Sequence, residues 1–357
     1  MNKKFFCTLV ALALCLPLCT GVALSSEYPK TMTDSAGREV TIQMPVERII
    51  ILNTDGAEAV RLLGAADKVV GVTDSITKKS YYFPEFQDRE VIGTWKEFDY
   101  ERIGEIAMED SDTIVPNIIV IAYTYTDRPY GVFAVEEGLA PFEKIAALGL
   151  DLYKQETLKD EITELGAILD REEAAQDYCN WCEENEDVVE GAVEGLEPPK
   201  VYIQGSDKGG LGALGTYGEG SALNDLCRMA GGDNIAKDLV EYPKVDWEWV
   251  IDQNPDVIVK IKSVKELGWS DTSELEEVID EITGRPGAES ISAVKNDRVY
   301  VCYWGMHFGA DSVVGLTYWA RLFHPSVDLD PGEVYREYLE RMGLEYPEGR
   351  IFVYPAV

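Results

Sequence analysis

Short runs of β-branched and aliphatic residues alternate with helix-forming stretches along both halves of the chain, and this alternation limits the fold more than any other feature. Asn53 to Asp55, after the first such run, has the residue types of a helix cap, and the amphipathic helix that follows ends at Gly64. Strands separated by helices are typical of α/β folds. The predicted buried strands are Ile49 to Leu52, Val69 to Val72, Ile118 to Ala122, Val201 to Ile203, Val257 to Val259 and Val299 to Val301.

Both halves carry this pattern, so we predict two Rossmann-like α/β lobes with a ligand cleft between them. Asp170 and Glu173 have the spacing of a capping pair, and they open a helical pattern that Pro198 and Pro199 stop. A helix of about 25 residues spans roughly 38 Å, the length of a two-lobed body. We therefore predict a single long backbone helix, which limits lobe motion. The predicted boundaries are 24–157 for the N-terminal lobe, 158–197 for the connecting helices and 198–357 for the C-terminal lobe.

The N-terminus has the layout of a secretory signal peptide. Lys3 and Lys4 precede an apolar run from Phe5 to Leu18, and small residues follow at Gly21 to Ala23. The run is shorter than the roughly 20 residues of a spanning helix. We predict a signal peptide at 1–23 with cleavage after Ala23, and hence an exported protein of the periplasm or cell surface. An uncleaved anchor and a lipid on Cys19 are the alternatives.

The charge balance is strongly acidic, with 65 acidic against 32 basic side chains and a net charge of −33. Such a chain repels phosphate backbones, so we expect no nucleic-acid partner. Only two histidines are present, His307 and His324, which excludes a histidine-rich metal cage. Cys179 and Cys182 form a C-x-x-C without a second pair or a nearby histidine, so we expect no zinc site. The disulfide state of the four cysteines Cys179, Cys182, Cys227 and Cys302 stays open.

A short internal repeat supports the division into two lobes. Asp99 to Ile103, before the strand at Ile118, is similar to Asp246 to Val250, before the strand at Val257. The repeat places Glu101 and Glu248 at matching positions. The interval in the first copy is longer, which we interpret as an insertion around Glu109 to Thr113.

Several segments, in their order and spacing, make the mature chain similar to a known family. It resembles the iron-siderophore, heme and cobalamin substrate-binding proteins of ABC importers, which have a helical backbone between two lobes. The first lobe lacks the Pro-Asp pair that the second keeps at Pro255 and Asp256. The segments that carry the resemblance are Asp34 to Val40, Arg48 to Val72, Gly93 to Trp95 with Glu101, Gly231 to Ile235, Asn254 to Ile258 and Ala293 to Tyr300.

The resemblance implies a receptor that delivers its ligand to ABC permease and ATPase subunits, with the membrane contacted only through the permease or an N-terminal anchor. In the family, the glutamates that correspond to Glu101 and Glu248 dock onto arginines of the two permease subunits. It also implies that the protein has no catalytic residue and no cofactor of its own, and that its partner is a small-molecule metal chelate.

Ligands of α/β sheets bind beyond the carboxyl ends of the strands, and aromatic residues recur at those ends here. Flat rings suit an iron chelate, either siderophore or heme, or a corrinoid, and the choice between these stays open. The resemblance to cobalamin receptors is closest at Trp95 and Trp304. His307, close to Tyr303, is a candidate metal-contacting imidazole, with a packing or hydrogen-bonding role as the alternative. The candidate ligand residues are Thr54, Trp95, Tyr123, Tyr217, Tyr242, Trp304 and His307.

A secreted enzyme or metal-binding protein on the same two-lobed fold is the alternative function. The sequence gives little support to an enzyme, because it contains no Gly-x-Ser-x-Gly elbow and no Walker loop. The glycine-rich stretch Gly209 to Gly212 lacks the lysine of a phosphate-binding loop. We therefore predict that the protein is not an enzyme.

Overall fold

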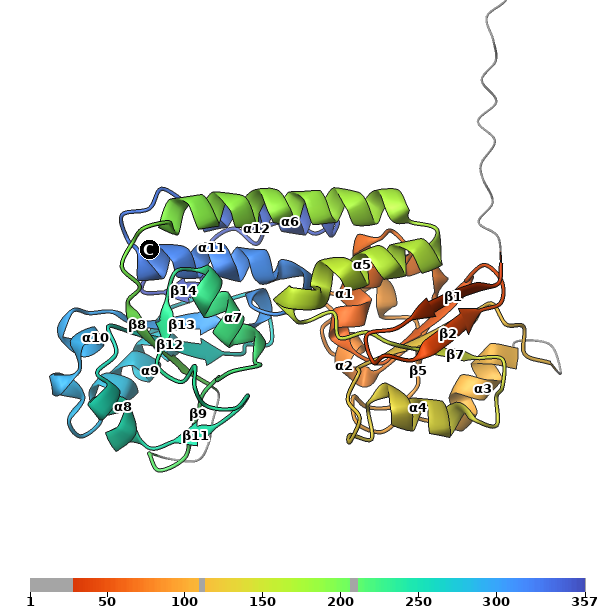
Figure 1. Cartoon of the computed structure of the whole chain (residues 1–357), viewed down its shortest axis with the longest axis horizontal. Coiled ribbons are helices and arrows are strands. Elements are labelled where there is room, and N and C mark those ends of the chain that lie inside the picture. The colour runs from red at the N-terminus through yellow and green to blue at the C-terminus, as the bar shows by residue number, and fades with distance from the viewer. Residues whose placement is uncertain (1–27, 109–112, 206–210, 357) are drawn as a thin grey trace, which may run out of the picture.

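The computed structural model describes residues 28–108, 113–205 and 211–356. The predicted signal peptide at 1–23, with Cys19, lies outside these ranges, as does most of the predicted insertion around Glu109 to Thr113. Figure 1 shows two lobes side by side beneath one long helix, each built on a sheet that is wholly or mostly parallel. The prediction of two α/β lobes is confirmed.

The N-terminal lobe is built on a five-stranded, wholly parallel sheet. Its chain order reverses between β3 and β6, the central pair, as in doubly wound folds, so a crevice forms beyond the carboxyl ends of these two strands. A β-hairpin of β1 (Lys30–Thr33) and β2 (Glu39–Ile42) packs beside β7. The strands lie in the order β5 (Glu90–Val91), β4 (Val69–Val72), β3 (Arg48–Ile51), β6 (Ile118–Ala122) and β7 (Ala146–Gly149), and the helices are α1 (Thr54–Leu62), α2 (Asp74–Thr77), α3 (Tyr100–Met108), α4 (Val132–Leu139) and α5 (Gln155–Leu169).

The C-terminal lobe repeats this plan with a different strand order. Its sheet is parallel except for the last strand, β14, which is antiparallel to β13. A separate two-stranded ribbon of β9 (Leu214–Gly215) and β11 (Lys244–Val245) lies beside it. The sheet order is β10 (Asp233–Asn234), β8 (Lys200–Gln204), β12 (Val257–Lys262), β13 (Val299–Tyr303) and β14 (Val353–Tyr354), and the helices are α7 (Ala222–Met229), α8 (Trp247–Gln253), α9 (Ser273–Thr283), α10 (Ser292–Lys295), α11 (Ser312–Phe323) and α12 (Pro331–Arg341).

The local signals that predicted these elements act as expected. All five residues of β6 are buried, because helices cover both faces of a parallel sheet and leave no polar side. The side chain of Asn53 caps α1 by accepting a hydrogen bond of 2.7 Å from the Gly56 amide. Each of the six predicted strands coincides with or overlaps an observed strand, and these predictions are confirmed.

The connecting helix α6 (Glu172–Val193) has 22 residues, about 33 Å in length, and Figure 1 shows it extending over both lobes. The predicted capping pair of Asp170 and Glu173 is wrong. Asp170 adopts a left-handed conformation that ends α5, and its carboxylate binds the Lys30 ammonium at 2.9 Å, so Arg171 is the residue that precedes α6. The chain therefore reverses in a tight turn, and α5 packs against α6 as a helical hairpin.

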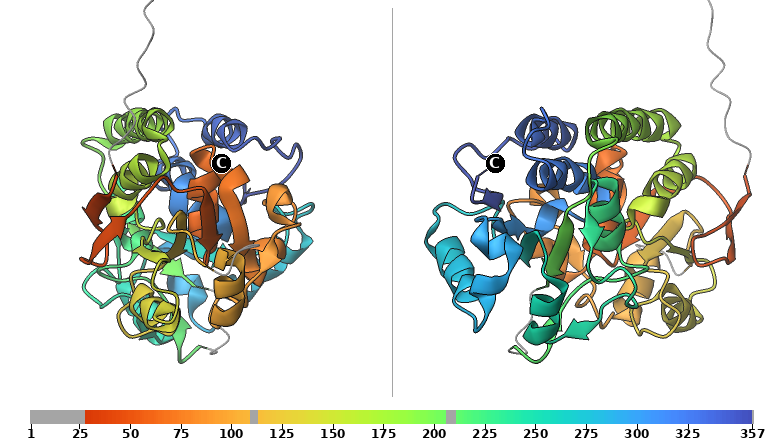
Figure 2. Two further views of the ribbon diagram at one scale, coloured as in Figure 1. Left: turned by 90° about the vertical axis from the view of Figure 1, so that its right-hand side faces the viewer. Right: turned by 60° about the vertical axis from the view of Figure 1, so that its left-hand side comes forward.

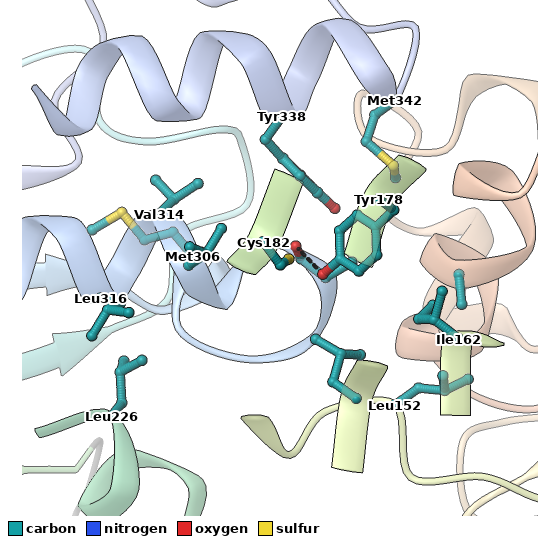
Figure 3. Packing of buried hydrophobic residues seen from close by; sticks show 14 of the residues in the cluster. Leu152, Ile162, Tyr178, Cys182, Leu226, Met306, Val314, Leu316, Tyr338 and Met342 are labelled. Atoms are coloured by element: carbon teal, nitrogen blue, oxygen red, sulfur yellow. Dashed lines mark hydrogen bonds between the residues drawn. The ribbon is translucent and has the colours of Figure 1, made fainter. Parts of the chain in front are cut away.

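The interior behind the cleft is shared by both lobes. Figure 3 shows Tyr178 and Cys182 of α6 beside Tyr338 of α12 and Met342, which directly follows that helix, in one hydrophobic cluster with residues of both lobes. The Tyr178 hydroxyl donates a hydrogen bond of 2.9 Å to the Ala310 carbonyl oxygen. Both views of Figure 2 place α6 and α12 along the same face. None of the described helices is long and apolar enough to cross a bilayer.

Candidate ligand-binding cleft

Residues of both lobes line one open cavity of about 330 Å³. Many of them follow the carboxyl ends of strands, as expected of ligand sites in α/β sheets. A larger hollow of about 540 Å³ lies on the flank of the N-terminal lobe, between β2, α4 and β7, and none of the predicted ligand residues lines it. The interlobe cavity is lined by Thr54, Asp55, Trp95, Tyr123, Tyr125, Tyr130, Tyr153, Tyr217, Tyr242, Trp304 and Phe308.

Five aromatic rings form the wall of the cleft that belongs to the N-terminal lobe. Their centres follow one another at 5.4 to 5.7 Å, mostly with edge-to-face geometry, which aromatic pairs prefer. Such packing holds each ring in place before a ligand arrives, so less conformational entropy is lost on binding. In order along the wall, the rings are Trp95, Tyr130, Tyr125, Tyr123 and Tyr153.

Two aromatic pairs form the opposite wall. The rings of Trp304 and Phe308 stack at 4.5 Å, and those of Tyr217 and Tyr242 meet edge to face at 6.0 Å. Tyr217 is buried, whereas Tyr242 is 53% exposed and Trp95, on the facing lobe, is 48% exposed. Large apolar rings left this open to solvent on both walls are typical of a binding surface.

Asp55 and Tyr123, which follow the central strands β3 and β6, also line the cleft. The Tyr123 hydroxyl donates a hydrogen bond of 2.5 Å to Asp55 Oδ2. Burial raises the pKa of Asp55, although the bond from Tyr123 acts in the opposite direction. Burial also raises the pKa of Tyr123 well above its ordinary value of 10, so its phenol stays protonated and remains a donor near neutral pH.

Six of the seven predicted ligand residues line this cavity, and His307 does not. The chain turns after β13 through a short 3-10 helix, Trp304–Met306, which places Trp304 in the cleft. His307 is 1% exposed, its Nδ1 lies 2.8 Å from the Tyr303 carbonyl oxygen, and its ring packs on Trp319. Burial lowers its pKa to about 3. The prediction of His307 as a ligand residue is corrected, because its side chain belongs to the core.

Five residues of the lining were missing from the predicted set. Tyr153 follows β7, a strand of small residues that sequence patterns did not reveal. Tyr125 and Tyr130 lie in the loop after β6, and Phe308 comes four residues after Trp304, beyond the end of the short 3-10 helix. Asp55 was interpreted only as part of a helix cap. Tyr125, Tyr130 and Phe308 could have been predicted, because they are aromatic residues close in sequence to Tyr123 or Trp304.

The internal repeat has a structural counterpart in the two lobes. Asp99 Oδ1 accepts a hydrogen bond from the Arg102 amide at the start of α3, and Asp246 Oδ1 accepts the same bond from the Trp249 amide at the start of α8. Glu101 and Glu248 therefore occupy the same position in the first turn of each helix, and both are exposed. Figure 1 shows α3 and α8 on different lobes, both on the side away from α6.

The four cysteines in the described ranges are buried free thiols, Cys179, Cys182, Cys227 and Cys302. Burial raises the pKa of Cys182 to about 12, so this thiol is not a thiolate at neutral pH. Within the described residues, no group of three or more histidine, cysteine or acidic side chains is arranged to hold a metal ion.

Two α/β lobes, one backbone helix and an interlobe cleft are the architecture of a two-lobed substrate-binding protein. The chain belongs to the periplasmic binding protein family, whose family model matches residues 49–303. This confirms the family and the class of function predicted from the sequence, and implies an extracytoplasmic location. Its relatives are transport receptors rather than enzymes.

Curated relatives include the petrobactin-binding protein YclQ of Bacillus subtilis, 22% identical over 83% of this chain and 90% of that protein. A cobalamin-binding protein of Halobacterium salinarum is 24% identical over 65% of this chain, which spans 58% of that protein's length. Among solved structures, the TroA-like periplasmic binding protein FepB of Veillonella parvula has a TM-score of 0.68 at 21% identity, covering 91% of this chain and 99% of that one. At this identity, the structural likeness shows the fold.

Proposed function

We propose that the protein captures an iron chelate or a corrinoid in the interlobe cleft and delivers it to the permease of an ABC importer. The observation that carries the proposal is the composition of the cleft, in which nine of eleven lining residues are aromatic. Aromatic rings give a large contact area with few rotatable bonds, and tyrosine and tryptophan also offer hydrogen-bond donors. A bulky chelate with flat faces matches such a surface.

The two classes of ligand have separate support. One relative is named for petrobactin and another for cobalamin, which keeps both a siderophore and a corrinoid open. Trp95 and Trp304 lie on opposite walls, and rings on two sides suit a flat macrocycle held between them. The ligand brings its own metal, and we propose no resident cofactor.

Delivery requires a docking surface, and we propose that Glu101 and Glu248 provide it. Each glutamate is exposed in the first turn of a helix on its own lobe, on the side away from α6. Two like charges on a rigid body engage two basic pockets at once, so each contact strengthens the other. The partners are the permease subunits with their ATPase, reached after export to the periplasm or cell surface.

Ligand titration tests the proposal directly. The chain from residue 24 onward is purified and titrated with cyanocobalamin, haemin and a series of ferric siderophores, with absorbance spectra and calorimetry as readouts. We expect stoichiometric binding of at least one chelate and recovery of that chelate unchanged. Failure of every chelate to bind, or chemical conversion of one, would overturn the proposal and favour the enzyme alternative.

A further inference from the structure

The first turn of α1 faces the cleft. Side chains of the protein itself already occupy the anion-binding position at this helix N-terminus. At the switch point of a doubly wound sheet, a helix N-terminus attracts anions through its unpaired N–H groups and dipole. Here the Asn53 side chain accepts the hydrogen bond of the Gly56 amide, and the Asp55 carboxylate occupies the same turn. An anionic group of a ligand would therefore meet a carboxylate at this helix end.

The rest of the lining offers no compensating cation. Among the lining residues, all of them described, Asp55 is the only aspartate, glutamate, lysine, arginine or histidine. Two lysines are chain neighbours of the lining residues Trp95 and Tyr153 but do not line the cavity themselves. Lys96 Nζ lies 4.2 Å from the Trp95 ring centre, and Lys154 forms an ion pair of 2.6 Å with Asp151. The lining thus lacks the arginine forks that hold anionic oxygens in other sites.

Two further acidic residues lie behind Asp55, both buried. Glu58 follows one turn later in α1, and Asp311 comes from the C-terminal lobe with no hydrogen-bond partner on either carboxylate oxygen within the described residues. A Cβ atom on Gly309 would lie 2.8 Å from Glu58 Oε2 and 3.4 Å from Asp55 Oδ1, so both carboxyl groups converge on one backbone segment. Burial raises the pKa of Glu58 to about 7 and that of Asp311 well above its ordinary value, so these two groups hold their protons more readily than exposed carboxyls do. The charge that an anion meets at the α1 end of the cleft is therefore that of Asp55, the acid that lines the cavity.

We infer that Asp55 determines which chelates enter, by accepting N–H donors or a positive charge of the ligand and by repelling polyanionic chelates. This inference rests on the proposed function, because it concerns the ligand of the same cleft. The substrate class is then a flat-faced chelate of neutral or positive charge whose end near α1 carries amide or ammonium groups. Tricatecholate complexes of iron, which are polyanionic, are outside this class.

A charge series of chelates tests the inference with wild-type protein and Asp55→Asn. The probes are cyanocobalamin, which carries amide side chains, the cationic ferrioxamine B, the neutral ferrichrome and the polyanionic ferric enterobactin. We expect the wild type to bind enterobactin most weakly. Asp55→Asn keeps an acceptor for Tyr123 but loses the charge, so the affinity for the preferred probe should fall about 10- to 100-fold and the disadvantage of enterobactin should shrink.

Asp127→Asn is the matched control, because Asp127 is an exposed acid of the same lobe whose side chain is 75% accessible and whose charge change is identical. It should alter neither affinity nor ranking. Asp55→Ser, also suited to a first helical turn, takes the place of the asparagine variant if that one does not fold. Strongest binding of enterobactin by the wild type, or an unchanged ranking in the Asp55 variant, overturns the inference. If no chelate binds at all, the proposed function itself fails.

Discussion

The hydroxyl oxygens of Tyr82 and Tyr338 lie 3.1 Å apart in the buried interior, although 256 positions separate the two residues in the chain. Tyr82 belongs to the N-terminal lobe and Tyr338 to α12, the last helix of the C-terminal lobe. Tyr82 also donates a hydrogen bond to Glu58 of α1. The lobes are therefore joined by polar contacts and a continuous core, in addition to the connecting helix α6.

This shared interior leads us to expect little lobe motion on ligand binding. Hinge closure would separate Tyr82 from Tyr338 and strip packed side chains such as Tyr178 of their contacts, which is costly in a dense core. Small-angle scattering should give the same radius of gyration with and without saturating ligand, within experimental error. A clear decrease on ligand addition would contradict the expectation.

Trp95→Ala and Trp304→Ala should each weaken binding of the cognate chelate by roughly 1–3 kcal/mol, because each truncation removes an aromatic contact in the cleft. Calorimetry gives the affinity, and thermal unfolding checks that the fold persists. Phe133→Ala is the control, because Phe133 is a partly exposed ring of the same lobe that does not line the cavity. If the double tryptophan variant binds as tightly as the wild type, the cleft is not the binding site.

Charge reversal of Glu101 and Glu248 together should abolish uptake through the cognate transporter while leaving ligand affinity in solution unchanged. The reason is that both residues are exposed on α3 and α8 and outside the cleft lining. The control reverses Glu173 and Glu184 of α6, which are exposed acids on a different face. Normal transport by the Glu101→Lys, Glu248→Lys variant would refute the docking role, as would a loss of ligand affinity.

The free energy of unfolding should fall as the pH rises from about 4.5 to about 7. Burial raises the pKa of Glu58 from its ordinary 4.5 to about 7, and the charge of Asp55 acts in the same direction. The folded state therefore binds the proton of the Glu58 carboxyl more tightly than the unfolded state does. The stabilisation is therefore complete at low pH and is lost as Glu58 ionises. Burial also raises the pKa of Asp311, so this carboxyl contributes to the pH dependence with the same sign.

Glu58→Gln keeps an acceptor for Tyr82 but cannot ionise, so it should flatten this pH dependence and stabilise the protein by up to about 3 kcal/mol at pH 8. Urea unfolding between pH 5 and 8 provides the measurement. Glu184→Gln, an exposed acid of α6, should leave the slope as it is. An equally steep slope in the Glu58 variant would show that the buried carboxyl is not its source.

Gly309→Ala should destabilise the protein more than Gly64→Ala does. Both glycines have positive φ, +80° and +65°, so both substitutions incur backbone strain of about 1 kcal/mol. A Cβ at Gly64 meets open space, whereas at Gly309 it lies 2.8 Å from Glu58 Oε2 of the other lobe. The difference between the two variants in thermal unfolding measures the tightness of the interlobe contact. An equal loss of stability in the two variants would mean that the structure around Gly309 accommodates the added methyl group without strain.

The sequence by itself determined the elements whose signals are local. The strand Ile118–Ala122 follows from a run of five aliphatic residues that only a doubly covered sheet buries. The cap at Asn53 and the repeated Asp caps of α3 and α8 follow from short polar side chains placed just before helical patterns. Hence the α/β class, the two lobes and the matched positions of Glu101 and Glu248 were predictable.

Tertiary structure decided where side chains point once the chain leaves an element. Trp304 and His307 are three residues apart, yet one lines the cleft and the other is in the core, because a short 3-10 turn and the packing of His307 on Trp319 fix the direction. Asp170 has the residue type of a helix cap, but its contact with Lys30, 140 positions away, belongs to the end of α5. Asp55 gained its place beside Tyr123 only because β3 and β6 are neighbours in the sheet. Directions and pairings of this kind depend on contacts between distant segments, which local periodicity does not encode.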